Sequence, residues 1–337
     1  MDQITVTPKE LLQTLCATIP AKHPVLIKGA PGIGKSDIVD QACKLCNFDL
    51  IISHPVVSDP TDYKGLPYAD KDGKAHFLPF SDLDTLIHTT RPTVYFLDDL
   101  GQAAQSVQAA CMQLILARRI NGHKVSDQVC FVAATNRKQD RAGVTGILEP
   151  VKSRFATILE LETDMQQWCL WAIDHNLPVE LIAFIRFRPN LLCDFKPSAD
   201  ITNSPCPRTV ANVGKLIKLG LPETLEYKVV SGAAGQGFAT EFISFLRMFR
   251  KMLSPDTVLM NPHAFTVPDD ISVLYALCTA ITGLVTDSSI DRFFVFVDRI
   301  PKEFGALAVN DLIQRKPEMK CTHEFISWVS RNQDMLF

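Results

Sequence analysis

A glycine-rich motif of eight residues constrains the fold of this chain more than any other feature. Residues 29–36 read Gly-Ala-Pro-Gly-Ile-Gly-Lys-Ser, which satisfies the pattern GxxxxGK[ST]. The apolar run 25–27 precedes the motif and a helix-compatible segment follows it, as the motif requires. In such a loop the backbone N–H groups surround phosphate oxygens, the lysine reaches the β and γ phosphates, and the final hydroxyl binds Mg²⁺. The predicted nucleoside triphosphate site therefore consists of Gly29, Ala30, Pro31, Gly32, Ile33, Gly34, Lys35 and Ser36.

Five apolar, β-rich runs separated by helical patterns favour a parallel sheet covered by helices on both faces. The runs are 25–27, 50–52, 94–97, 129–132 and 157–159. A capping box with proline at the first helical position predicts a helix over 8–18, and an amphipathic spacing predicts another within 101–120. Asp72-Gly73 and Asn121-Gly122 predict two β-hairpins between strands of the sheet.

After about residue 162 the pattern becomes helical, with proline-marked joints. The helical stretches are 165–175, 178–187, 208–219, 238–253, 270–285, 288–298 and 322–335, and the proline-rich segment 189–207 interrupts them. We therefore expect an α/β nucleotide-binding domain over 1–162, an α-helical lid over 163–250 and a C-terminal helical extension over 251–337.

Composition excludes some classes of protein. The 34 basic and 37 acidic side chains give a net charge of −3, which is no footprint for general nucleic-acid binding. The ten cysteines form no CxxC pair, and Cys43 and Cys46 are interpreted as packing residues, so reduced thiols are expected. Neither a signal-peptide pattern nor an apolar run of membrane-spanning length occurs. We expect a soluble, cytoplasmic protein with no membrane association.

Two strand ends carry residues suited to phosphoryl transfer. Asp98 and Asp99 follow the buried-type run 94–97, and we assign Asp98 to Mg²⁺ and Asp99 to the base that polarises the attacking water. The run 129–132 leads to Asn136, whose amide can both donate and accept, and we assign it to orienting that water. Taken alone, either feature is also typical of an ordinary polar turn.

A series of motifs in this order resembles the AAA+ ATPases, specifically the MoxR-like group. The motifs are GAPGIGKS, VYFLDD, FVAATNR, EPVKSRF and PCPRT, and the resemblance covers roughly residues 20 to 220. It implies a P-loop AAA+ fold with a five-stranded sheet, ATP and Mg²⁺ as ligands, and a homohexameric ring.

The resemblance also assigns roles to arginines. Arg154 would reach the nucleotide of the neighbouring subunit, and Arg208 would contact the γ phosphate of its own subunit from the lid. Both assignments agree with the value of a planar cation near the transferred phosphoryl group. The alternatives are a surface salt bridge for Arg154 and a helix-start arginine for Arg208. Arg141 is either a second intersubunit arginine or a solvated loop residue.

Segment 58–67 and the two hairpins resemble elements that line the pore or touch the client in MoxR-like proteins; ordinary surface hairpins are the alternative interpretation. The resemblance implies a remodelling chaperone with a partner that bears a von Willebrand factor A domain. Beyond residue 220 it is weaker, although 231–237 and 325–337 look like a phage and bacterial subset of these ATPases.

One position departs from the family. The family usually has Glu where this chain has Asp99, whose side chain is shorter by one methylene, so slow turnover or a regulatory ATP cycle is expected.

Two other functions share the phosphate loop. A nucleic-acid motor or loader would need basic loops, of which the chain offers only 118–119 and 123–124. A P-loop kinase or monomeric switch would have no use for Asn136, Arg154 and Arg208.

Overall fold

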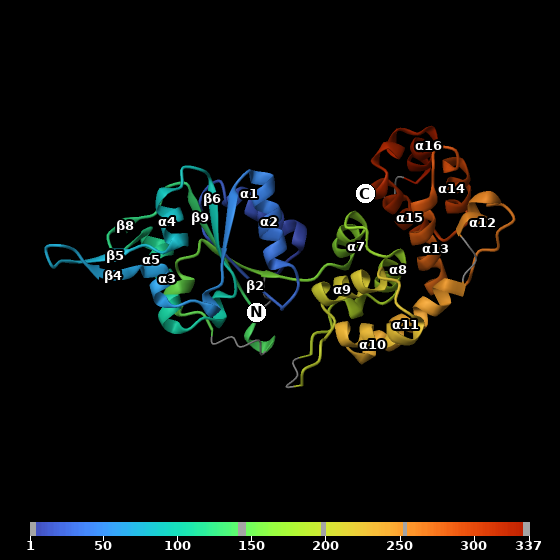
Figure 1. The fold of residues 1–337 in the computed structure, drawn as a ribbon. Helices are drawn as coiled ribbons and strands as arrows, with labels where there is room; N and C mark the ends of the chain where they lie inside the picture. Colours follow the sequence, from blue (N-terminus) through green and yellow to red (C-terminus); the bar gives the residue numbers. More distant parts are fainter. Residues whose placement is uncertain (1–4, 141–145, 197–199, 252–254, 333–337) are drawn as a thin grey trace. The chain divides into compact units, whose positions relative to one another are not determined.

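A computed structural model describes residues 5–140, 146–196, 200–251 and 255–332 (Figure 1). The chain divides into two compact units. Unit 1 comprises residues 1–164 and 195–199, and unit 2 comprises residues 165–194 and 200–337.

Unit 1 is built around a parallel sheet of six strands in the order β1-β10-β2-β9-β6-β3. The strands are β1 (Thr5–Val6), β2 (Val25–Gly29), β3 (Asp49–Ser53), β6 (Thr93–Leu97), β9 (Val129–Thr135) and β10 (Thr157–Leu161). The five predicted strands are confirmed. The sheet has six strands and not the five expected. The additional strand is β1, which has two residues, lies just before the first helix in the sequence and pairs with β10. Every residue of β6 and β9 is buried, as expected for central strands with a helical layer on each side.

Helices cover both faces of this sheet. They are α1 (Pro8–Thr18), α2 (Lys35–Cys46), α3 (Pro60–Lys64), α4 (Ser81–His88), α5 (Gln105–Ala117) and α6 (Glu149–Lys152). Helices α1 and α2 lie on one side of the sheet, and α3, α4 and α5 lie on the other (Figure 1). Helix α1 begins at the predicted capping box, where Glu10 N donates to Thr7 Oγ1 and Thr7 N donates to Glu10 Oε2.

Both predicted hairpins are present. The first pairs β4 (Leu66–Ala69) with β5 (Ala75–Leu78), and the second pairs β7 (Arg119–Ile120) with β8 (His123–Lys124). Asn121 and Gly122 have φ values of 47° and 89°, the left-handed conformation that a tight two-residue turn needs at both positions. The two hairpins are in contact, since His123 Nε2 lies 2.8 Å from Phe77 O of β5. Asn121 Nδ2 donates to Lys64 O at the end of α3 at 2.7 Å.

Unit 2 is helical in its described residues. Its helices are α7 (Met165–Asp174), α8 (Val179–Phe187), α9 (Pro207–Ile217), α10 (Glu223–Ala234), α11 (Gln236–Lys251), α12 (Pro255–Met260), α13 (Ile271–Leu284), α14 (Ile290–Val297), α15 (Lys302–Arg315) and α16 (His323–Arg331). One apolar core lies mainly among α7 to α11 and another among α12 to α16. Buried Arg186 of α8 and Asp311 of α15 form an ion pair, with Arg186 Nη2 at 2.6 Å from Asp311 Oδ1. The division into a lid and a separate extension stays a prediction.

Within the residues described, every helix is too short or too polar to cross a bilayer.

Candidate active site

The phosphate loop connects the carboxyl end of β2 to the first turn of α2, and its glycines are needed for its shape. Gly32 and Gly34 have φ values of 72° and 95°, a region that other residues rarely adopt. A Cβ atom on Gly29 would lie 2.5 Å from Ile33 Cδ1 and 3.1 Å from the carbonyl oxygen of Leu161. The loop therefore takes the tight path that leaves the amino end of α2 open toward an anion.

Lys35 is buried and its ammonium group is held by three acceptors. Its Nζ donates to Gly29 O at 3.1 Å, to Ala30 O at 3.0 Å and to Asn136 Oδ1 at 2.7 Å. Asn136 is within reach because β9, which precedes it, pairs directly with β2. The structure thus brings together two residues that are separated by 101 positions in the sequence.

The Asn136 amide connects this lysine to the acidic strand end. Its Nδ2 donates to Asp99 Oδ1 at 3.2 Å while its Oδ1 accepts from Lys35. Asn136 is 8% exposed, so water competes poorly for either contact. Asn136 was assigned to this site because an amide can both donate and accept, and here it does both.

Ser36 and Asp98 also meet. Ser36 Oγ donates to Asp98 Oδ2 at 2.7 Å, and the other carboxylate oxygen of Asp98 accepts from Asp99 N at 3.0 Å. A hydroxyl and a carboxylate are the oxygen ligands that Mg²⁺ prefers, and such sites often complete the shell with substrate phosphates and water. These two residues therefore fit Mg²⁺. The described residues hold no cluster of three or more His, Cys, Asp or Glu side chains arranged for a metal.

Asp99 has an unusual backbone conformation. Its φ of 58° lies in the left-handed region, which Asp tolerates better than most residues but which still carries strain. The 3₁₀ turn that follows it, η2 (Leu100–Gln102), packs tightly on β9, since a Cβ on Gly101 would lie 2.1 Å from Thr135 Oγ1. Close packing therefore holds the turn that follows Asp99 against β9.

The segment 58–67 docks onto the strand end beside Asp98. Tyr63 of α3 is buried, and its hydroxyl lies 2.8 Å from Ser53 Oγ at the end of β3. The backbone oxygen of Ser53 accepts from Asp98 N at 2.9 Å. Burial raises the pKa of Tyr63 to about 12, so the phenol stays neutral and can donate.

Arg154 follows α6 and lies outside this cluster. Its Nη1 donates to Ser153 Oγ at 3.2 Å, and its Nε is buried without a partner among the described residues. The described residues give it no hydrogen bond to the phosphate loop, Asp98, Asp99 or Asn136. The segment 146–148, which leads into α6, is held by the fully buried Gln108. This side chain donates to Gly146 O at 3.0 Å and accepts from Leu148 N at 3.1 Å. The role of Arg154 toward a neighbouring subunit stays a prediction.

Two further arginines were predicted to take part, Arg208 and Arg141. Arg208 is exposed in the first turn of α9, in unit 2. That helix begins at a side-chain cap in which Cys206 N donates to Thr209 Oγ1 at 2.9 Å. The role of Arg208 toward the triphosphate stays a prediction. Arg141 lies outside the described residues.

Four charged residues beside the site were missed by sequence reasoning. Lys28, Arg137, Asp140 and Glu160 form an ionic cluster at the ends of β2, β9 and β10. A signal was available, because Lys28 and Glu160 are charged residues inside the otherwise apolar strand sequences VLIKG and TILEL.

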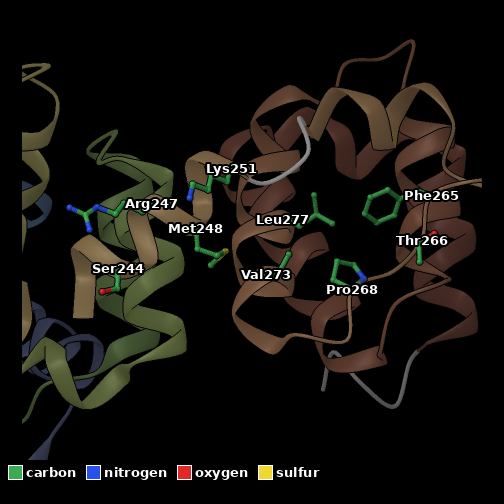
Figure 2. Close-up of a pocket in the computed structure, with 9 residues that line it drawn as sticks. All are labelled: Ser244, Arg247, Met248, Lys251, Phe265, Thr266, Pro268, Val273 and Leu277. Carbon is green, nitrogen blue, oxygen red and sulfur yellow. The ribbon is translucent and has the colours of Figure 1, made fainter. Parts of the chain in front are cut away.

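A pocket of about 570 Å³ lies in unit 2, and the residues that line it include none of the predicted site residues (Figure 2). It is lined mainly by α11, α13 and the segment between α12 and α13. Met248, Phe265 and Leu277 contribute apolar surface to it.

The match to a known protein family lies within unit 1. Residues 25–163 match the family described as ATPase family associated with various cellular activities (AAA). A comparison with curated proteins gave no match. Among solved structures, the RuvB Holliday junction branch migration motor of Thermotoga maritima has 18% identity and a TM-score of 0.40, covering 81% of this chain and 80% of that chain. A putative ATPase from Cytophaga hutchinsonii has 14% identity and a TM-score of 0.36, covering 97% of this chain and 90% of that chain.

Proposed function

We propose that this chain hydrolyses ATP with Mg²⁺ in a ring of six copies and remodels a partner protein. The match of residues 25–163 to the AAA ATPase family, whose general activity is nucleotide hydrolysis, supports the hydrolytic part. One observation carries the hydrolytic part of this proposal: the Asn136 amide joins Lys35 of the phosphate loop to Asp99 of the acidic strand end. Three motifs that are distant in sequence therefore share one site.

The side chains have complementary tasks in this proposal. The N–H groups of the loop bind phosphate oxygens, and Lys35 exchanges its carbonyl and amide acceptors for the β and γ phosphates. Asn136 Oδ1, released by Lys35, then accepts a hydrogen bond from the attacking water. Asp99 accepts the proton of that water, in an orientation fixed by Asn136 Nδ2. Ser36 and Asp98 would hold Mg²⁺, which neutralises charge on the phosphate oxygens.

Turnover by this site is proposed to be slow. The Asp99 carboxylate is one methylene shorter than the Glu usual in the resembling family, and misplacement of a base by about 1 Å can cost about 100-fold in rate. The fixed left-handed backbone at Asp99 limits how far the side chain can compensate.

Two arginines are proposed to complete the site. Arg154 would act on the nucleotide of the adjacent copy, where a well-placed cation is worth about 10³ to 10⁵ in rate. The absence of hydrogen bonds from Arg154 to its own phosphate loop among the described residues is compatible with this role. Arg208 would act within its own copy, from the proposed lid over 163–250.

The remodelling role is supported by the two joined hairpins. Exposed apolar side chains gather on and next to the first hairpin, at Leu66, Tyr68, Leu78 and Phe80. The motifs shared with MoxR-like proteins favour a partner with a von Willebrand factor A domain and a cytoplasmic setting. The extension over 251–337 is proposed to serve assembly or partner binding.

Steady-state ATP hydrolysis at increasing protein concentration tests the proposal. We expect Mg²⁺-dependent turnover that rises with assembly. Asp99→Asn should lose most of this turnover and still bind nucleotide. Asp84→Asn, the same change at an exposed position, is the control and should keep wild-type turnover. Full turnover by Asp99→Asn would contradict the assigned site. Stimulation by single-stranded or duplex DNA with steep salt dependence would contradict the remodelling role and support a nucleic-acid motor.

A further inference from the structure

The ionic cluster of Lys28, Arg137, Asp140 and Glu160 has no part in the chemistry assigned above. Two of its members nevertheless neighbour residues of that site in the sequence, Lys28 at Gly29 and Arg137 at Asn136. Glu160 and Asp140 are only 8% and 5% exposed. Buried carboxylates are costly unless cations and hydrogen bonds compensate them.

Glu160 connects two cations. Its Oε2 lies 2.7 Å from Lys28 Nζ, and its Oε1 lies 3.8 Å from Arg137 Nη1. Arg137 also holds Asp140 with two bonds, from Nε to Oδ2 at 3.0 Å and from Nη2 to Oδ1 at 2.9 Å. Two cations and two carboxylates thus balance one another at this point of unit 1.

The cluster is attached to the site through the backbone. Lys28 directly precedes Gly29, the first residue of the phosphate loop, and pairs with Glu160 in β10 and with Thr135 in β9. Arg137 directly follows Asn136, whose amide joins Lys35 to Asp99. A movement of the backbone at Asn136 therefore displaces Arg137 or strains its contacts.

The cluster is also attached to the strand that leads out of unit 1. Glu160 lies in β10, which ends at Leu161, and α7 of unit 2 begins at Met165. Glu160 is thus separated by only a few residues from the chain crossing between the two units.

From this arrangement we propose that Glu160 is a positioning residue for ATP hydrolysis, which acts through Arg137 to hold Asn136 in its working orientation and ties that orientation to strand β10. The inference rests on the proposed function. When Lys35 leaves Asn136 for the phosphates, Asn136 loses one of its two partners, and Arg137, anchored by Glu160 and Asp140, keeps the amide aimed at Asp99.

Glu160→Gln tests this role, because it keeps the size of the side chain and removes its charge. Arg137 then loses an anionic partner, and Asn136 becomes less well fixed. We expect kcat to fall about tenfold or more with KM changed less than about threefold, since positioning errors act on the chemical step more than on phosphate binding. Glu162→Gln, the same change at an exposed position two residues further along, serves as the matched control and should leave kcat unchanged.

Non-additivity separates positioning from general stability. Arg137→Gln should lower kcat to a similar degree, and the double variant Glu160→Gln with Arg137→Gln should lose little beyond either single change. Arg137→Lys keeps the cation but not the planar fork, so it should lose part of kcat, and it decides the question if Glu160→Gln does not fold.

A folded Glu160→Gln protein with wild-type kcat would overturn the inference, and so would losses that multiply in the double variant. Wild-type protein without ATPase activity would instead overturn the proposed function.

Discussion

Asn136→Ala removes the side chain that joins Lys35 to Asp99, and its effects on stability and on turnover should differ. In the nucleotide-free protein it breaks two hydrogen bonds to charged groups, at 2.7 Å and 3.2 Å. Each such bond contributes about 1.5 to 3 kcal/mol, or about 3 to 6 kcal/mol for the pair. Lys35 keeps two carbonyl acceptors, and water can reach the half-buried Asp99, so we expect a net loss of about 2 to 3 kcal/mol in the free energy of unfolding.

Turnover should respond more strongly. Without the amide the attacking water is no longer oriented, and removal of one preorganised group typically costs about 10² to 10³ in kcat. KM should change little, because the phosphate loop and Lys35 remain. Urea unfolding without nucleotide and steady-state hydrolysis with Mg²⁺ measure the two effects separately. Gln113→Ala, which removes an exposed amide from α5, is the control. An Asn136→Ala protein that kept both its stability and its kcat would refute the bridging role.

Three further predictions concern other parts of the molecule. Gly101→Ala should lower the free energy of unfolding by about 1 to 3 kcal/mol in urea titrations, because its Cβ would meet Thr135 Oγ1 at 2.1 Å, and Thr135→Ala should restore most of the loss. Arg186→Met should cost about 3 to 5 kcal/mol by leaving buried Asp311 unpaired, whereas Arg186→Met with Asp311→Leu should cost clearly less; equal losses would contradict the pairing argument. Burial raises the pKa of the Cys111 thiol from 9.0 to about 12, so above pH 9 the unfolded chain releases a proton that the folded chain keeps. Stability should then fall by about 1.4 kcal/mol per pH unit for this thiol, and a Cys111→Ala protein with an equally steep decline between pH 9 and 11 would contradict it.

The sequence predicted much of unit 1 because its signals are local. Strands β6 and β9 are buried throughout and read as continuous apolar runs, and the Asn121-Gly122 turn requires the positive φ values that it shows. The convergence of Lys35, Asp99 and Asn136 was expected from the order of motifs. Their actual hydrogen bonds depend on β2 and β9 being neighbours in the sheet, which no local pattern specifies.

The missed elements have physical reasons. Strand β1 has only two residues and is stabilised by its pairing with β10 rather than by its own composition. Helix α15 contains Gly305, which packs closely against Val297, and a buried Asp311, which pairs with Arg186. Neither residue is a large apolar one, so the helical spacing of apolar residues is weakened in the sequence. The Lys28 and Glu160 pair was missed because the two residues become partners only through the register of β2 and β10.

We propose that one copy supplies the phosphate loop and Asp99 while its neighbour supplies Arg154. Mixing two inactive variants tests it most directly: Arg154→Ala keeps its own hydrolytic residues, and Asp99→Asn keeps its arginine. In an equimolar mixture about one interface in four joins an intact site to an intact arginine, so we predict recovery of about one quarter of wild-type ATPase activity. Two variants that are each inactive, assemble together and still show no hydrolysis would contradict the shared site.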